Sequence, residues 1–212
     1  MKVGYSTSST LRQWGGAAAV LGGALLGVWG YLHGNIVLSS SHMLAAAMDL
    51  LIDMLLLVGL VGLCAWWREG RTGWLETVGF VFGFAGGALS VAQGIHAFIT
   101  ASGLAEPAPW YVYIRAASGL PAYVFRWLPM LPIGMIIVGM GAIRVGELRG
   151  WGILLLTMGL SSVAYHVTNS GGVFGTGLAH VLFGAVYSLS WLVLGCLLWT
   201  AGNGRNAHTS QQ

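Results

Sequence analysis

The chain alternates long apolar stretches with short polar connections. Six of these stretches approach the roughly 20 residues that an α-helix needs to cross a hydrocarbon layer of about 30 Å. Backbone groups inside such a layer have no water to bond to, so each stretch is predicted to form a helix that satisfies its own N–H and C=O groups. The predicted spans are residues 14–33, 43–67, 74–101, 127–146, 151–168 and 177–200.

Composition places these helices in a membrane. The chain is 56% hydrophobic and 7% charged, against about 25% charged in soluble domains. Glycines four residues apart, Gly23 with Gly27 and Gly79 with Gly83, predict close helix packing. Cys64 and Cys196 lie in apolar stretches without CxxC spacing, as small core residues do. The predicted fold class is an all-α integral membrane protein, a bundle of six transmembrane helices.

The distribution of basic residues predicts the orientation of the bundle. One side of the predicted spans carries Lys2, Arg12, Arg68, Arg71, Arg144, Arg149 and Arg205. The other side carries only Arg115 and Arg126. The positive-inside rule therefore places both termini in the cytoplasm and the chain in the plasma (inner) membrane as a multi-pass protein. The topology leaves a cytoplasmic N-terminus (1–13), an outer loop (102–126) and a mobile polar tail (202–212). It also explains the net charge of +3 without a nucleic-acid partner.

Two carboxylates interrupt the second predicted span. Asp49 and Asp53 are the only aspartates in the chain, and their spacing of four places them on one helix face. If the span begins at Met43, they lie about 9 Å and 15 Å from its outer end. Charged residues in a span usually face the bundle interior and are paired or functional, so we expect a buried pair. No Lys or Arg lies at matching depth. A metal or other cation, protonation, or hydrogen bonds from neighbouring helices would stabilise the pair.

Five histidines fall in the outer half of the predicted bundle. Imidazole and carboxylate together suit zinc, copper or iron. The candidate metal ligands are Asp49, Asp53, His42, His96, His166 and His180, while His33 ends the first span. Neither HxxxH nor HExxH is present, so each histidine would come from a different helix. His42 is about 10 Å above Asp49 along the axis, too far for both to bind one ion, and is placed at the entrance.

Residues 39–53, which read SSSHMLAAAMDLLID, resemble the second transmembrane helix of cation diffusion facilitators. The resemblance continues over Gly86-Gly87 and Gly94-Ile95-His96 to about residue 100. It implies six spans, cytoplasmic termini and antiport of zinc or manganese, with Asp49 and Asp53 as cation ligands. That family supplies a second His-x-x-x-Asp from its fifth helix and carries a cytoplasmic domain. Here Ser170 follows His166 at that spacing, and no such domain follows.

Three alternatives remain open on the residues. The favoured function is a membrane protein that binds a divalent cation from the outer side, with cation transport as an activity that such a site would serve. Ser162-x-x-x-His166 resembles a fragment of membrane hydrolases that hold zinc, and haem b between His96 and His166 or His180 is a redox alternative. The third is a non-catalytic subunit of a larger complex, in which the aspartates only join helices.

No catalytic residue is assigned, and enzymatic activity is the less favoured class. The expected partners are the lipid bilayer, a metal ion, and either a second copy of the chain or other membrane subunits. Glu106 in the outer loop and Glu69, Glu76 and Glu147 near the inner ends of the spans are predicted to be solvated charges.

Overall fold

The structure is a computed structural model, and it describes residues 5–35, 42–68, 73–103, 130–146, 148–169 and 178–209. These residues form six α-helices and no strand, which confirms the predicted all-helical class. The helices are α1 (Tyr5–Asn35), α2 (His42–Trp67), α3 (Trp74–Ala101), α6 (Met130–Val145), α7 (Arg149–Asn169) and α8 (Leu178–Thr209).

Each helix contains most of one predicted span, and the differences lie at the ends of the chain. α1 begins at Tyr5, inside the predicted N-terminal segment, and α8 continues to Thr209, inside the predicted polar tail. Backbone hydrogen bonding therefore continues where apolar periodicity has ended. The predicted outer loop lies outside the described residues from position 104 onward.

Three helices of the described part are long and apolar enough to cross a membrane: Met43–Trp67, Trp74–Ile99 and Val181–Ala201. The shorter α6 is apolar as well. Large apolar side chains also cover the outside of the bundle, among them Val81, Leu160 and Leu189, while Ser161 and Ser188 are buried. An apolar outside suits contact with lipid and is unusual for a monomeric protein in water.

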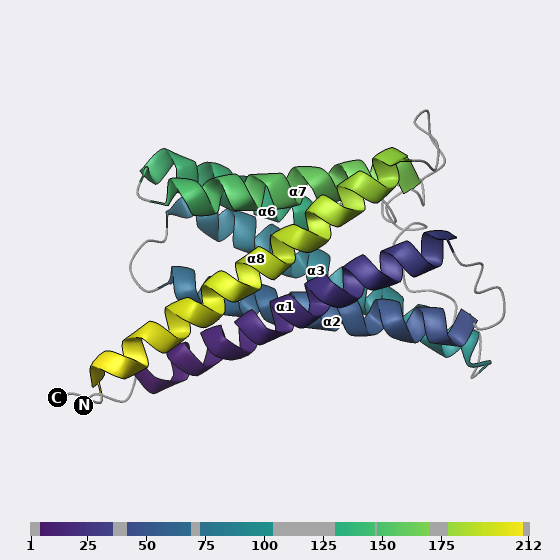
Figure 1. The fold of residues 1–212 in the computed structure, drawn as a ribbon, viewed down its shortest axis with the longest axis horizontal. Coiled ribbons are helices and arrows are strands. Elements are labelled where there is room, and N and C mark those ends of the chain that lie inside the picture. Colours follow the sequence, from purple (N-terminus) through teal and green to yellow (C-terminus); the bar gives the residue numbers. More distant parts are fainter. Residues whose placement is uncertain are drawn as a thin grey trace, which may run out of the picture.

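The six helices form a closed ring in which neighbours in sequence are neighbours in space. α1 packs on α2, α2 on α3, α3 on α6, α6 on α7 and α7 on α8, and α8 returns to α1. α2 also touches α8 across the ring. Figure 1 shows α1 and α8 side by side, with the first turns of α1 and the last turns of α8 at the same end of the bundle.

Glycines bring the helix backbones into contact, as their spacing predicted. A Cβ atom added to Gly134 of α6 would lie 2.5 Å from the backbone O of Gly79 and the backbone N of Gly83 in α3. A Cβ atom added to Gly15 of α1 would lie 2.4 Å from the Cα of Gly62 in α2. The ring therefore depends on small residues that let backbones approach closely, as in other helix pairs in lipid.

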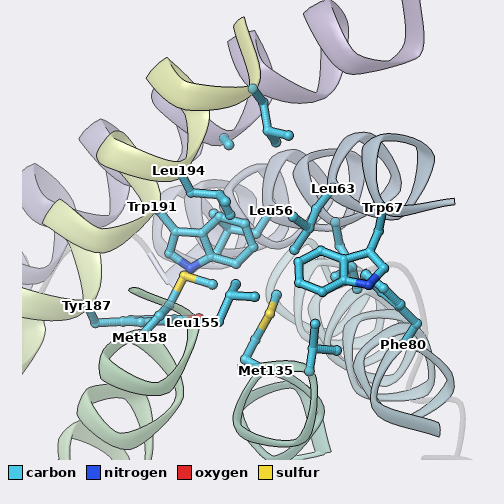
Figure 2. Close-up of a cluster of buried hydrophobic side chains, with 14 of the residues drawn as sticks. Leu56, Leu63, Trp67, Phe80, Met135, Leu155, Met158, Tyr187, Trp191 and Leu194 are labelled. Atoms are coloured by element: carbon cyan, nitrogen blue, oxygen red, sulfur yellow. The ribbon is translucent and has the colours of Figure 1, made fainter. Parts of the chain in front are cut away.

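The centre of the ring is filled by apolar side chains. Figure 2 shows them converging: Leu56, Leu63 and Trp67 of α2, Phe80 of α3, Met135 of α6, Leu155 and Met158 of α7, and Tyr187, Trp191 and Leu194 of α8. Leu63, Leu155, Met158, Trp191 and Leu194 are completely buried. At the end of α2, Trp66 stacks on Trp151 of α7 with 4.2 Å between ring centroids. This half of the interior is densely packed.

Candidate functional site

Both aspartates lie on the face of α2 that points into the bundle. Leu56 and Leu63 follow Asp49 at intervals of seven residues, and Leu60 follows Asp53 at the same interval. Seven residues make almost two helical turns, so these side chains share one face. Leu56, Leu60 and Leu63 are 4%, 1% and 0% exposed, which identifies the face as the buried one.

The two aspartates differ in burial. The expectation that both carboxylates would be buried is wrong for Asp49, which is exposed, whereas Asp53 is partly buried. Asp49 shares the face of the buried Leu56, so its exposure does not result from pointing outward. It lies about 10 Å from the beginning of α2 at His42. The exposed carboxylate is therefore nearer the end of the bundle where α2 begins.

Asp49 is held by side chains from other helices. The indole N–H of Trp29 in α1 donates a hydrogen bond of 2.8 Å to Asp49 Oδ1. Tyr165 of α7 is within electrostatic range of Asp49. A Cβ atom on Gly184 of α8 would lie 3.1 Å from the Tyr165 ring, and one on Gly30 of α1 would lie 3.9 Å from its hydroxyl. Tyr165 thus lies between α8 and α1 and places its hydroxyl beside the residue that follows Trp29.

Asp53 lies one turn deeper and interacts electrostatically with Asp49 and with Tyr187 of α8. The Tyr187 hydroxyl has Ser162 of α7 and Trp191 of α8 beside it, and the Tyr187 and Trp191 ring centroids are 6.4 Å apart. Within the described part of the chain, neither Ser162 Oγ nor Trp191 Nε1 makes a hydrogen bond of acceptable geometry, although both atoms are buried.

The histidines are only partly placed by the structure. His166 of α7 is exposed, its ring lies edge-on to Tyr165, and its Nδ1 is 2.7 Å from the backbone O of Ser162. His96 of α3 is partly buried. The side chains of His42 and His180 lie outside the described residues. Among the described side chains, no three from His, Cys, Asp and Glu are grouped so as to hold a metal ion.

Positive side chains lie far from the carboxylates along the helices. α2 contains no Lys or Arg, and Arg68, directly after it, lies about 22 Å from Asp53 along the helix axis. Arg144 ends α6 and Arg149 begins α7, and both are exposed. Among the described residues, an indole N–H, aromatic rings and tyrosine hydroxyl groups lie near the carboxylates. Two neighbouring carboxylates in such surroundings favour a bound cation or protonation.

Sequence reasoning missed the aromatic half of this site. Trp29, Tyr165, Tyr187 and Trp191 each combine an aromatic ring with a polar N–H or O–H group, and all four lie within helices. On α7 the interior face runs through Met158, Ser162 and Tyr165 at helical spacing. A polar aromatic residue on the interior stripe of an apolar helix was the signal that could have identified it.

Glu76 also differs from its prediction. It was expected to be a solvated charge, but it is 3% exposed in the first turn of α3. A Cβ atom on Gly141 of α6 would lie 2.6 Å from Glu76 Oε1. Glycine at this position lets the end of α6 pack directly on the carboxylate, which removes it from solvent.

Comparison of the chain with protein-family models, with curated proteins and with solved structures gives no match.

Proposed function

We propose that the chain is a six-span membrane protein with cytoplasmic termini that binds a cation at Asp49 and Asp53, and that it transports this cation. One observation carries the proposal. An exposed carboxylate lies on the interior face of the bundle, with a second carboxylate one turn deeper and no cationic residue in the same helix.

The membrane part rests on the three helices of spanning length and on the apolar outside of the bundle. α1, α6 and α7 complete the ring with the other three and would span beside them. The ring brings the beginning of α7 next to the end of α6, where Arg149 and Arg144 lie. These arginines and Arg68 follow the pattern of positive charges expected on the cytoplasmic side.

The cation part rests on charge and on donor chemistry. Two carboxylates in an apolar bundle attract positive charge because the surroundings screen them poorly. The oxygens of Asp49, Asp53, Tyr165 and Tyr187 are hard donors, the type that suits alkali and alkaline-earth ions. A transition metal would need imidazole ligands as well, and His42, His96, His166 and His180 remain the candidates for that role.

The proposal of transport rests on a difference in side-chain burial between the two ends of the bundle. Asp49, near the end where α2 begins, is exposed, and the packed core around Leu60 and Leu155 lies between the carboxylates and the other end. A site that is open to one side and closed to the other is what alternating access requires of each of its end states.

The test is cation binding by the full chain in lipid nanodiscs. Na⁺, Ca²⁺, Mn²⁺, Zn²⁺ and tetramethylammonium are each titrated while thermal stability and bound ion are measured. We expect at least one of them to bind in a near-stoichiometric amount and to be lost in Asp49→Asn/Asp53→Asn. Glu76→Gln is the matched control, since it removes a buried carboxylate elsewhere. If the wild type binds none of the five, or if the double variant binds as well as the wild type, the proposal is wrong.

A further inference from the structure

The contacts between α2 and α3 follow a regular register. Cβ atoms added to three glycines of α3 would each touch one leucine side chain of α2: Gly94 at 3.1 Å from Leu50 Cδ1, Gly87 at 2.8 Å from Leu57 Cδ1, and Gly83 at 3.2 Å from Leu60 Cδ2. Positions on α3 decrease as those on α2 increase, so the two helices are antiparallel. A row of glycines on α3 therefore receives a row of larger side chains from α2, as small residues do at helix interfaces in lipid.

Asp53 and Ser90 belong to the same two rows. Asp53 is seven residues before Leu60 on α2, and Ser90 is seven residues after Gly83 on α3. Seven residues make almost two helical turns, so each of the two shares a face with the residue that is already in contact. Because the helices are antiparallel, both steps run in the same direction, and Ser90 lies opposite Asp53. The other two glycine contacts lie about one turn to either side of this pair.

Ser90 gives the glycine row its one ligand atom in this region, because Gly83, Gly87 and Gly94 have no side chain. Asp53 and Ser90 are both partly buried, so each keeps some exposed surface. A hydroxyl oxygen has lone pairs that can bind a cation beside a carboxylate. Both oxygens are hard ligands, the type that alkaline-earth ions take, whereas zinc takes nitrogen and sulfur as well.

We infer that Ser90 Oγ is a third protein ligand of the cation, and that the site selects a hard divalent cation of the alkaline-earth class. This inference rests on the proposed cation site at Asp49 and Asp53. The cation lies between α2 and α3, with the Asp53 carboxylate on one side and Ser90 Oγ on the other. Water completes the roughly six to eight oxygen ligands that an ion such as Ca²⁺ takes.

Calorimetric titration of the full chain in nanodiscs with Ca²⁺ and Zn²⁺ tests the role of Ser90 as a ligand. The wild type is expected to bind Ca²⁺ more tightly than Zn²⁺. Ser90→Ala is expected to weaken Ca²⁺ binding about tenfold, because one contact to a charged group is lost. Ser190→Ala is the matched control, since it removes a buried hydroxyl that donates to the Val186 carbonyl of its own helix. This control is expected to bind Ca²⁺ as the wild type does.

Ser90→Cys tests the register without relying on the native cation. A thiolate opposite a carboxylate provides a site for Cd²⁺, because soft cations prefer sulfur ligands. Ser90→Cys is expected to bind Cd²⁺ at least about tenfold more tightly than the wild type, and Ser90→Cys/Asp53→Asn is expected to lose this gain. Ala88→Cys, at an exposed position of α3, is the control and is expected to gain no tight Cd²⁺ binding.

The outcomes separate this inference from the proposed function. Unchanged Ca²⁺ affinity in Ser90→Ala, or tighter binding of Zn²⁺ than of Ca²⁺ by the wild type, would overturn the inference and leave the cation site in place. The register would be wrong if Ser90→Cys gained no Cd²⁺ affinity, or if the gain survived Asp53→Asn. Absence of any cation binding by the wild type would overturn the inference together with the proposed function.

Discussion

The two halves of the bundle interior are built on the same helix faces but from different chemistry. On α7 the interior stripe passes from Leu155 and Met158 to Ser162 and Tyr165, and on α8 it passes from Leu194 back to Tyr187. On α2 it passes from Leu56 back to the two aspartates. The change from apolar to polar side chains occurs in all three helices at the half of the bundle where α2 begins.

This difference assigns stability mainly to the apolar half of the bundle and the proposed site to the polar half. The apolar half has fully buried side chains from four helices, so close packing holds the helices in place there. The polar half places an exposed carboxylate beside a partly buried one in an apolar bundle, which costs free energy. Groups that cost stability and persist in a fold are typical of functional sites.

Introducing a carboxylate into the apolar half is expected to have the largest effect. Leu60 is 1% exposed and lies two turns after Asp53 on the same face. Leu60→Asp is expected to cost more than about 3 kcal/mol, because the new charge would meet only apolar neighbours. The measurement is the yield of monodisperse protein after extraction, with Leu60→Met as the volume-matched control. A well-folded Leu60→Asp variant would show that this half of the bundle accepts a charged side chain.

Truncation within the apolar half is expected to reduce stability without changing the site. Leu155 is completely buried in the cluster of Figure 2. Leu155→Ala is expected to lower the free energy of unfolding by about 2–4 kcal/mol through the cavity that it leaves. Reversible unfolding in mixed micelles measures this loss, and cation affinity serves as the internal control. A cation affinity that falls together with stability would show that the two halves are coupled.

Neutralising Asp53 is expected to reduce cation affinity without reducing stability, the reverse of the effect of Leu155→Ala. Asp53→Asn keeps the shape of the side chain but removes a charge that interacts with Asp49. We expect cation affinity to fall by about 2–3 kcal/mol, on the order of 30- to 150-fold. Stability without ligand is expected to be unchanged or higher, because a carboxylate repelled by its neighbour has been removed. Marked destabilisation with unchanged binding would assign Asp53 to the scaffold.

Removing the hydrogen bond at Asp49 is expected to have the smallest effect. Trp29→Phe keeps an aromatic ring but removes the N–H that donates to Asp49 Oδ1 at 2.8 Å. The expected loss is about 1–2 kcal/mol, divided between α1–α2 stability and cation affinity. Thermal denaturation with and without saturating cation separates the two parts. Double variants with Asp49→Asn supply the control, since the effect of Trp29→Phe should then largely disappear.

The chain by itself determined the helices and the identity of the acidic pair. Apolar runs of spanning length are a strong signal because each helix closes its own backbone hydrogen bonds, so their positions depend little on the rest of the fold. Asp49 and Asp53 stood out because carboxylates are rare in such runs. The spacing of four then fixed a common face without reference to any other helix.

The tertiary structure decided which groups surround that pair. Tyr165 and Tyr187 are more than a hundred residues away from the aspartates in sequence, and Trp29 lies in the preceding helix. Only closure of the ring of helices brings these three side chains near the aspartates. Exposure of Asp49 and burial of Glu76 were likewise set by neighbouring helices, and at Glu76 it is Gly141 of α6 that meets the carboxylate. Periodicity specifies the direction in which a side chain points from its own helix. The side chains that it meets there depend on how all the helices pack.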